Sequence, residues 1–189
     1  MILSALRPPG NVEQMLADIQ THLFRTLGVL SARAFPPLIP VAWSARPLDL
    51  GLVDPAPLPP LRLGVAGCDD ERVVVPLEPQ APLDELSRTL GEQASQPAEA
   101  APFSIDTPAV LLALKEPWST GEITDALSKG SSKTRRAASA AEAVHGTVVR
   151  TFSLVTIEIE QWENTGGLRV RWAERDRRRL RKSATTPSR

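Results

Sequence analysis

The sequence predicts an α+β domain of two pseudo-symmetric halves, with antiparallel sheets and flanking helices. Two apolar stretches with the same layout carry this prediction. Residues 35–43 and 103–114 each lead from a phenylalanine through proline into a strand that reads as buried. An amphipathic helical pattern precedes each stretch, with apolar residues three and four positions apart. This order is typical of a domain whose halves each supply one central strand.

The first elements are a short strand and a helix. Ile2 to Leu6 is an apolar run stopped by a Pro-Pro-Gly sequence. We expect Asn11 to cap the helix that follows and Gly28 to end it. The apolar stripe of this helix is formed by Val12, Leu16, Ile19, Leu23 and Leu27.

The middle of the chain predicts a loop, a hairpin and a second helix. Residues 47–60 are rich in proline, which removes backbone donors and excludes regular structure. Residues 61–67 and 72–77 are strand-like and flank an acidic turn, which indicates a β-hairpin. Leu83, Leu86 and Leu90 form the stripe of the second helix.

The last third predicts a weakly ordered region and a terminal hairpin. Residues 118–143 include a possible short helix at Thr120, followed by a Gly-, Ser- and Lys-rich segment that we expect to be mobile. Residues 148–160 alternate as a strand, and a turn at 164–167 leads into a second strand over 168–172. We expect the basic stretch to Leu180 to continue as a helix.

These elements predict one domain over residues 1–182, with halves of about 1–77 and 78–182, and a disordered tail at 183–189. A chain of 189 residues with 42% hydrophobic content can bury one sizeable core. We expect eight residues to share it: Leu16, Ile19, Leu23, Leu63, Val74, Leu112, Leu154 and Ile157.

The sequence also indicates the cellular compartment of the protein. No run of apolar residues is long enough to span a membrane, and residues 1–7 lack the pattern of a secretory signal. We therefore expect a cytoplasmic protein with no membrane partner. The single cysteine, Cys68, cannot form an internal disulfide, and its acidic neighbours disfavour a reactive thiolate.

Charge is segregated along the chain although its net value is zero. Residues 1–126 hold 8 Lys/Arg and 16 Asp/Glu, a net charge of −8, whereas residues 127–189 hold 14 and 6, a net charge of +8. A surface of the second half could therefore attract polyanions. The alternative is a solvated basic segment that pairs with the acidic half.

The order of elements resembles that of the two-histidine phosphoesterase superfamily, also called the 2′-5′ RNA ligase-like fold. The resemblance covers nearly the whole chain, from Ala5-Leu6-Arg7-Pro8-Pro9 before the first helix to the closing strands at 152–159 and 167–172. It is one of layout and hydrophobic pattern. It implies a groove between the two central strands, in which the family holds its substrate.

The signature of that family is a His-x-Thr/Ser motif on each central strand. One imidazole acts as general base and the other as general acid, and the hydroxyls hold the phosphate. The resemblance places Leu38 and Pro40 at the first motif, and Ala109 and Leu111 at the second. None of these residues can transfer a proton, so the resemblance implies a degenerate member without catalytic residues.

The remaining patterns offer no replacement site. His145-Gly146-Thr147 spells His-x-Thr but precedes its strand, and the other histidine, His22, lies on the first helix. One cysteine and two distant histidines predict no metal site, and neither glycine-rich turn has the spacing of a phosphate-binding loop. We predict no cofactor.

A binding site is therefore predicted in the basic second half. Its candidate residues are Lys133, Arg135, Arg136, Arg169, Arg171, Trp172 and Arg175. Trp172 either packs in the core or stacks on a base beside Arg171 and Arg175. We expect a non-catalytic protein that binds RNA, a nucleotide or a protein partner. The alternatives are an RNA 2′,3′-cyclic phosphodiesterase or 2′-5′ RNA ligase-like enzyme, and a structural interaction protein without a ligand.

Overall fold

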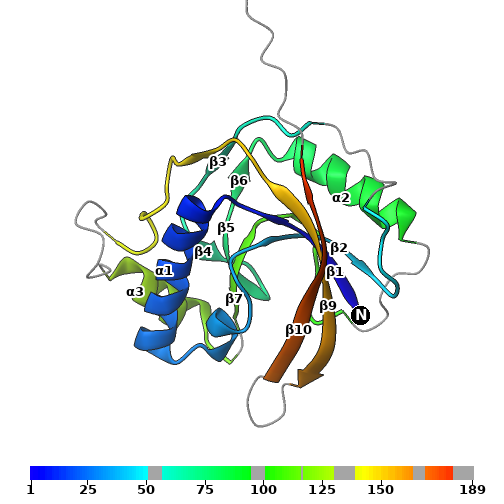
Figure 1. The fold of residues 1–189 in the computed structure, drawn as a ribbon. Coiled ribbons are helices and arrows are strands. Elements are labelled where there is room, and N and C mark those ends of the chain that lie inside the picture. Colours follow the sequence, from blue (N-terminus) through cyan, green and yellow to red (C-terminus); the bar gives the residue numbers. More distant parts are fainter. Residues whose placement is uncertain (51–56, 95–100, 116, 130–138, 164–168, 181–189) are drawn as a thin grey trace, which may run out of the picture.

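The fold was analysed in a computed structural model, which describes residues 1–50, 57–94, 101–115, 117–129, 139–163 and 169–180. Side chains are described in the same ranges except for 161–163 and 169. The chain forms antiparallel sheets with helices against them, so the predicted α+β class is confirmed (Figure 1). Lys133, Arg135 and Arg136 and the predicted tail at 183–189 lie outside the described residues, as does the turn at 164–167.

A four-stranded antiparallel sheet joins the two ends of the chain. It contains β1 (Ile2–Arg7), β2 (Ile39–Ser44), β9 (Ser153–Glu163) and β10 (Arg169–Arg179), in the order β10-β9-β1-β2. Leu3 of β1 is paired with Trp43 on one side and with Ile157 on the other. Because β9 and β10 pair with β1 and β2, this sheet combines both sequence halves.

The middle of the chain builds two three-stranded ladders. One has the order β6-β3-β8 and the other β4-β5-β7. Their strands are β3 (Leu61–Leu63), β4 (Gly67–Cys68), β5 (Arg72–Val75), β6 (Leu77–Glu78), β7 (Val110–Leu114) and β8 (Val148–Val149). The predicted hairpin is confirmed, since β3 pairs with β6 and β4 with β5.

That hairpin is interrupted where Gly64 lies against Pro76. The Gly64 amide donates to the Pro76 carbonyl at 2.9 Å. A Cβ at Gly64 would lie 2.7 Å from Cγ of Pro76, so a larger residue cannot fit without a shift of the proline. The close approach of the two residues therefore explains why glycine stands at this position.

The helices are α1 (Gly10–Leu27), α2 (Ala81–Gln93) and α3 (Thr120–Ser128), with a 3₁₀ turn, η1, at Leu30–Arg33. The predicted cap at Asn11 is wrong, because Pro9 precedes the first turn and its carbonyl accepts the amides of Val12 and Glu13. Gly28 ends α1 as predicted, with a φ of 74°. The short helix at Thr120 is also confirmed, and Ser119 and Glu122 form its capping box.

Two strand-helix-strand units give the molecule its pseudo-symmetry. In the first, β1 and β2 pair after the chain has passed through α1; in the second, β5 and β7 pair after α2. Each helix packs against the other unit, α1 against β7 and α2 against β2 (Figure 1). The units meet where the Leu111 amide donates to the Leu38 carbonyl at 2.8 Å. The two similar sequence patterns thus occupy equivalent, adjoining strands.

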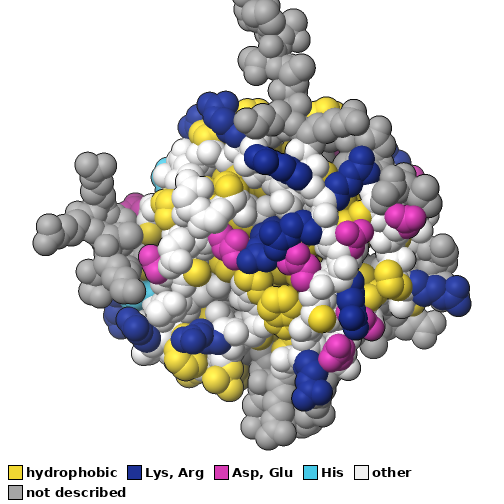
Figure 2. Space-filling view, in the orientation of Figure 1, with side chains coloured by type: hydrophobic (Ala, Val, Ile, Leu, Met, Phe, Trp, Pro, Cys, Tyr) yellow, Lys and Arg dark blue, Asp and Glu magenta, His cyan; other side chains and the backbone are white. Residues whose placement is uncertain are grey.

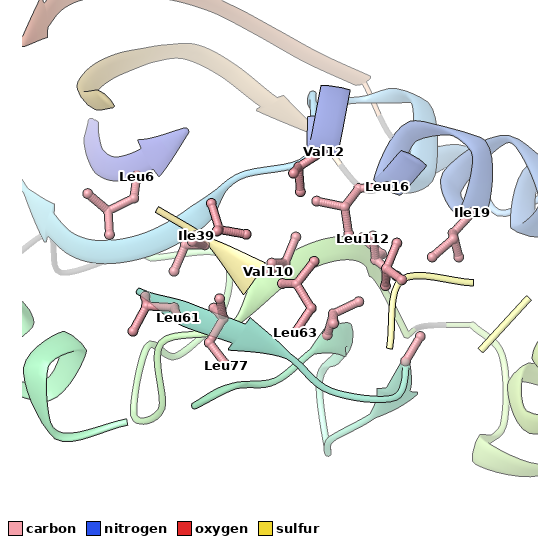
Figure 3. Close-up of a cluster of buried hydrophobic side chains, with 14 of the residues drawn as sticks. Leu6, Val12, Leu16, Ile19, Ile39, Leu61, Leu63, Leu77, Val110 and Leu112 are labelled. Atoms are coloured by element: carbon pink, nitrogen blue, oxygen red, sulfur yellow. The ribbon is translucent and has the colours of Figure 1, made fainter. Parts of the chain in front are cut away.

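The main apolar cluster draws on both sequence halves (Figure 3). Six of the predicted core residues belong to it: Leu16, Ile19, Leu23, Leu63, Leu112 and Leu154. Val74 is only half-buried, because its neighbours Val73 and Val75 take the core-facing side of β5. Ile157 is buried in a second cluster, because it lies on the opposite face of β9 from Leu154. The single domain over 1–182 stays a prediction.

The C-terminal basic stretch is a strand, and the prediction of a helix there is wrong. β10 runs to Arg179 and pairs with β9 through two bulges, at Arg171/Trp172 and Glu174/Asp176. The stretch lacks an apolar stripe at helical spacing, whereas β9 offers a long partner for its backbone groups. The strand predicted over 148–160 is divided into β8 and β9 by residues 150–152.

Candidate functional site

The two strands that the resemblance singled out meet in the interior. We call Leu38, Pro40, Ala109 and Leu111 the strand seam. Leu38 is 1% exposed, Ala109 and Leu111 are each 4% exposed, and Pro40 is buried. None of the four side chains can donate or accept a proton, so the strand seam cannot perform acid-base chemistry.

A buried carboxamide lies beside this junction of strands. Gln20 of α1 is buried, and its Nε2 donates to the carbonyls of Phe35 at 3.2 Å and Leu112 at 2.9 Å. These bonds join the helix to the chain before β2 and to β7. Gln20 therefore stabilises the junction, and a carboxamide does not titrate. Its role was not predicted, because its position beside the apolar stripe of α1 carries no distinct sequence signal.

An aromatic cluster covers the face of the four-stranded sheet that lies opposite the main core. Phe35 stacks on Trp172 with ring centroids 6.3 Å apart, and Trp43 meets Phe103 edge-on at 5.1 Å. The indole Nε1 of Trp172 donates to the Ala34 carbonyl at 2.7 Å, and that of Trp43 donates to the Phe103 carbonyl at 3.1 Å. Leu38 belongs to the same cluster. The aromatic cluster thus packs directly on one residue of the strand seam.

The two histidines lie on separate elements away from the seam. Nε2 of His22 donates to the Ala126 carbonyl at 2.8 Å, which links α1 to α3. His145 is exposed in the turn before β8, where its backbone amide donates to the Glu142 carbonyl at 3.0 Å. His22 is thus a structural residue, and no second imidazole accompanies His145 in its turn.

The described part of the predicted basic site lies on β10. Arg171 and Arg175 are exposed, whereas Trp172 is half-buried against Phe35. The backbone of Arg169 belongs to β10, and its side chain lies outside the described residues. The structure therefore brings Arg171, Trp172 and Arg175 onto one strand. The other three basic candidates, Lys133, Arg135 and Arg136, lie outside the described residues.

Carboxylates neutralise part of this basic strand. Arg175 pairs with Glu158 and, at 3.6 Å, with Glu160. Two nitrogens of Arg177 donate to Glu174 at 2.7 and 2.8 Å. Arg171 and Arg179 are exposed and have no ion-pair partner among the described residues. Among the described side chains of β10, these two arginines are therefore exposed positive charges without a carboxylate partner.

Glu174 also joins a network that connects β10 to β1 and α1. Arg7 donates to Glu13 at 2.7 Å and to Glu174 at 3.1 Å. The hydrogen bond from Arg177, together with the positive charges of Arg177 and Arg7, holds the pKa of Glu174 below its usual value. Figure 2 shows the resulting mixture of acidic and basic side chains on this face. The network was not predicted, because Arg7 and Glu174 are far apart in the sequence.

A shallow depression of about 590 Å³ lies on the outer face of β3 and its neighbours. Its lining consists of Pro60, Arg62, Glu78, Pro79 and Val148. Arg62 is paired in register with Glu78 on one side and with Val148 on the other. The depression holds one cation and one anion but no pair of groups suited to acid-base catalysis.

In the part of the chain that the structure describes, no three His, Cys, Asp or Glu side chains are grouped as metal ligands. Every described helix is too short or too polar to cross a membrane.

Comparison with known proteins gives similar solved structures but no sequence relative. Neither a protein-family model nor a curated protein matches the sequence. The protein TT0787 of Thermus thermophilus is 15% identical, with a TM-score of 0.49, over 96% of this chain and 98% of that chain. A structure described as a phosphoesterase is 17% identical, with a TM-score of 0.42, over 95% and 97%. The fold of this chain is therefore described from its own strand order and pairing.

Proposed function

We propose that this chain is a degenerate two-histidine phosphoesterase-like protein, which binds an anionic partner through β9 and β10 and does not catalyse a reaction. The observation that carries the proposal is the strand seam. The resemblance assigns its four residues to the positions of two proton carriers and two hydroxyls, and each of the four is buried and apolar. Acid-base cleavage of a phosphodiester needs both proton carriers, so the seam supports binding elsewhere on the molecule.

The location of the binding surface follows from the aromatic cluster and from the charges. Phe35, Trp43 and Trp172 pack in one apolar cluster with Leu38, and this packing supports a binding surface elsewhere on the molecule. We call β9 and β10 together the C-terminal hairpin. Arg171 and Arg179 give it exposed positive charge, and Lys/Arg outnumber Asp/Glu by 14 to 6 over residues 127–189. An anionic partner is the complementary ligand.

The absence of catalysis is tested with a 2′,3′-cyclic nucleotide as substrate. We expect the purified protein to hydrolyse it no faster than buffer does. His145→Ala is the informative variant, because His145 carries the remaining His-x-Thr sequence. Turnover that disappears in His145→Ala would overturn the proposal in favour of the enzyme alternative. Turnover that survives this substitution would point to a contaminant or to another site, which repurification distinguishes.

The anionic partner is tested by elution from an immobilised polyanion such as heparin. We expect Arg171→Glu/Arg179→Glu to elute at a clearly lower salt concentration than the wild-type protein. Arg25→Glu/Arg46→Glu is a matched control, because it changes the net charge equally at exposed arginines outside the hairpin. Equal shifts in both variants would show that only net charge matters. No retention even at low salt would favour a protein without an anionic ligand.

A further inference from the structure

β10 is the outermost strand of the four-stranded sheet. It pairs with β9 on one side, and no strand in the described ranges pairs with its other side. β10 spans 11 residues, from Arg169 to Arg179. An outermost strand of this length presents a row of backbone donors and acceptors to which another strand can be added. Figure 2 displays the charged side chains on this side of the molecule.

The charges of β10 determine what kind of strand can be added to its outer edge. The strand contains six arginines, at positions 169, 171, 175, 177, 178 and 179, against Glu174 and Asp176. Its net charge is therefore positive even though some arginines are paired. Arg171 lies near one end and Arg179 at the other, and both are exposed without a described ion-pair partner. An incoming strand with carboxylates near both ends would place opposite charges across the new ladder.

We propose that the open edge of β10 binds an extended acidic peptide of a protein partner as an additional strand. This inference rests on the proposed function, and it specifies the partner as an acidic polypeptide. Backbone hydrogen bonds to the edge supply general affinity for a strand. The arginines supply preference for carboxylate side chains, because these relieve the positive charge of β10.

The same observations disfavour a second copy of the chain. Two β10 strands paired antiparallel about Glu174 would place Arg171 opposite Arg177 and Arg169 opposite Arg179. A parallel pair would place identical residues opposite each other. Like charges directly opposite are destabilising in a sheet. The arginines of β10 thus oppose self-association but favour an acidic strand.

Single-stranded RNA is the other anionic macromolecule to consider, and the geometry fits it less well. Such RNA is usually held by aromatic side chains that stack on its bases. Trp172 is half-buried, stacks on Phe35 and donates its indole N–H to Ala34, so it offers no free platform. The backbone groups at a strand edge can align an incoming peptide residue by residue, but they offer no corresponding pairing pattern to the nucleotides of RNA.

The proposal is tested with a synthetic peptide as long as β10, in which glutamate and threonine alternate. Three further ligands serve as comparisons: the same peptide with N-methyl groups on alternate residues, the peptide with lysine in place of glutamate, and oligouridylate RNA. N-methylation keeps the charge but removes backbone donors. We therefore expect the glutamate peptide to bind and both altered peptides to bind at least about tenfold more weakly.

Amide hydrogen exchange of the complex locates the added strand. Binding at the edge should slow the exchange of amides within β10 that are open in the free protein, while amides of β2 remain unchanged. Arg171→Glu/Arg179→Glu should weaken binding of the glutamate peptide about tenfold. The control pair Arg25→Glu/Arg46→Glu should weaken it much less.

Several outcomes would overturn the inference and leave the proposed function standing. If the N-methylated peptide binds as well as the unmodified one, the contact is electrostatic and no strand is added. If RNA binds and slows no β10 amide while the peptide does not bind, the anionic partner is a nucleic acid. If neither binds and the polyanion column also fails to retain the protein, both proposals fail, and the arginines serve to protect an open edge.

Discussion

The two outer strands of the four-stranded sheet, β2 and β10, differ in the surroundings of their outer edges. The chain just before β2 meets β7 through the Leu38–Leu111 bridge, and both residues are buried. The edge of β10 has no partner strand in the described structure and carries arginine and carboxylate side chains. One edge is thus closed by burial, and the other is left open but charged.

This difference separates what each edge can do. The β2 edge stands at the position that the family resemblance assigns to catalysis, yet packing has made it part of the interior. The β10 edge has no resemblance to a catalytic element, and its strand carries the exposed side chains of Arg171 and Arg179. Buried apolar residues cannot take part in acid-base chemistry, whereas exposed charges can contact a partner.

The largest expected effect on stability is that of a substitution at Leu38, in the buried junction just before β2. Leu38→Ala removes a side chain that is 1% exposed between the two strand units. We expect the free energy of unfolding to fall by about 2 to 5 kcal/mol, from lost burial and the cavity left behind. Urea denaturation measures it. Leu30→Ala is the matched control, since Leu30 is 52% exposed. A similar loss in both variants would contradict the buried position of Leu38.

An intermediate effect is expected at Trp172, which connects the C-terminal hairpin to the aromatic cluster. Trp172→Phe keeps a ring beside Phe35 but leaves the Ala34 carbonyl without its donor. We expect the free energy of unfolding to fall by about 1 kcal/mol or more. Trp118→Phe should have a smaller effect, since no hydrogen bond to the Trp118 indole is found among the described residues. If Trp172→Phe leaves stability unchanged but weakens RNA binding, the base-stacking alternative is favoured.

A smaller effect, dependent on pH, is expected from Glu174. Its pKa is lowered in the folded protein, first by the hydrogen bond from Arg177. Because the unfolded chain binds the proton more readily, this stabilisation is present above the unfolded pKa and is lost as pH falls through the folded one. Glu174→Gln should lower stability at pH 7 by about 1 kcal/mol or less, and by much less near pH 3.

The control for this experiment is Asp106→Asn, which removes an exposed carboxylate with no described ion pair. At pH 7 its effect on the unfolding free energy should be smaller than that of Glu174→Gln, because no described ion pair is lost. Urea denaturation at each pH provides the comparison. A Glu174→Gln effect that does not depend on pH would contradict the role assigned to the Arg7 and Arg177 contacts.

The smallest effect is expected at Arg175, whose side chain is 50% exposed. Its ion pairs with Glu158 and Glu160 face solvent, so Arg175→Ala should change the unfolding free energy by about 0.5 kcal/mol or less. In about 1 M salt the difference should vanish, because screening acts over about 3 Å there. A large, salt-insensitive loss would instead indicate that Arg175 supports the bulge in β10.

Much of the fold could be predicted because local patterns and long-range packing agree. The apolar stripe of α1 predicted the helix, and Gly28, which adopts a positive φ, predicted where it ends. The alternation of apolar residues in β9 predicted which side chains lie on each face of the strand. Where two local patterns were both acceptable, prediction failed. The basic residues of β10 have no helical stripe and no strong strand pattern, so the partner strand decided their conformation.

The sequence alone shows that Leu38, Pro40, Ala109 and Leu111 carry no group that transfers a proton, and that positive charge is concentrated in the second half. These are properties of residue types at positions along the chain. The burial of these four positions, the packing of Leu38 with Phe35, Trp43 and Trp172, and the place of β10 at the outside of its sheet among the described strands became visible only in the folded structure. Burial and strand order depend on contacts between residues distant in the sequence, which no local pattern encodes.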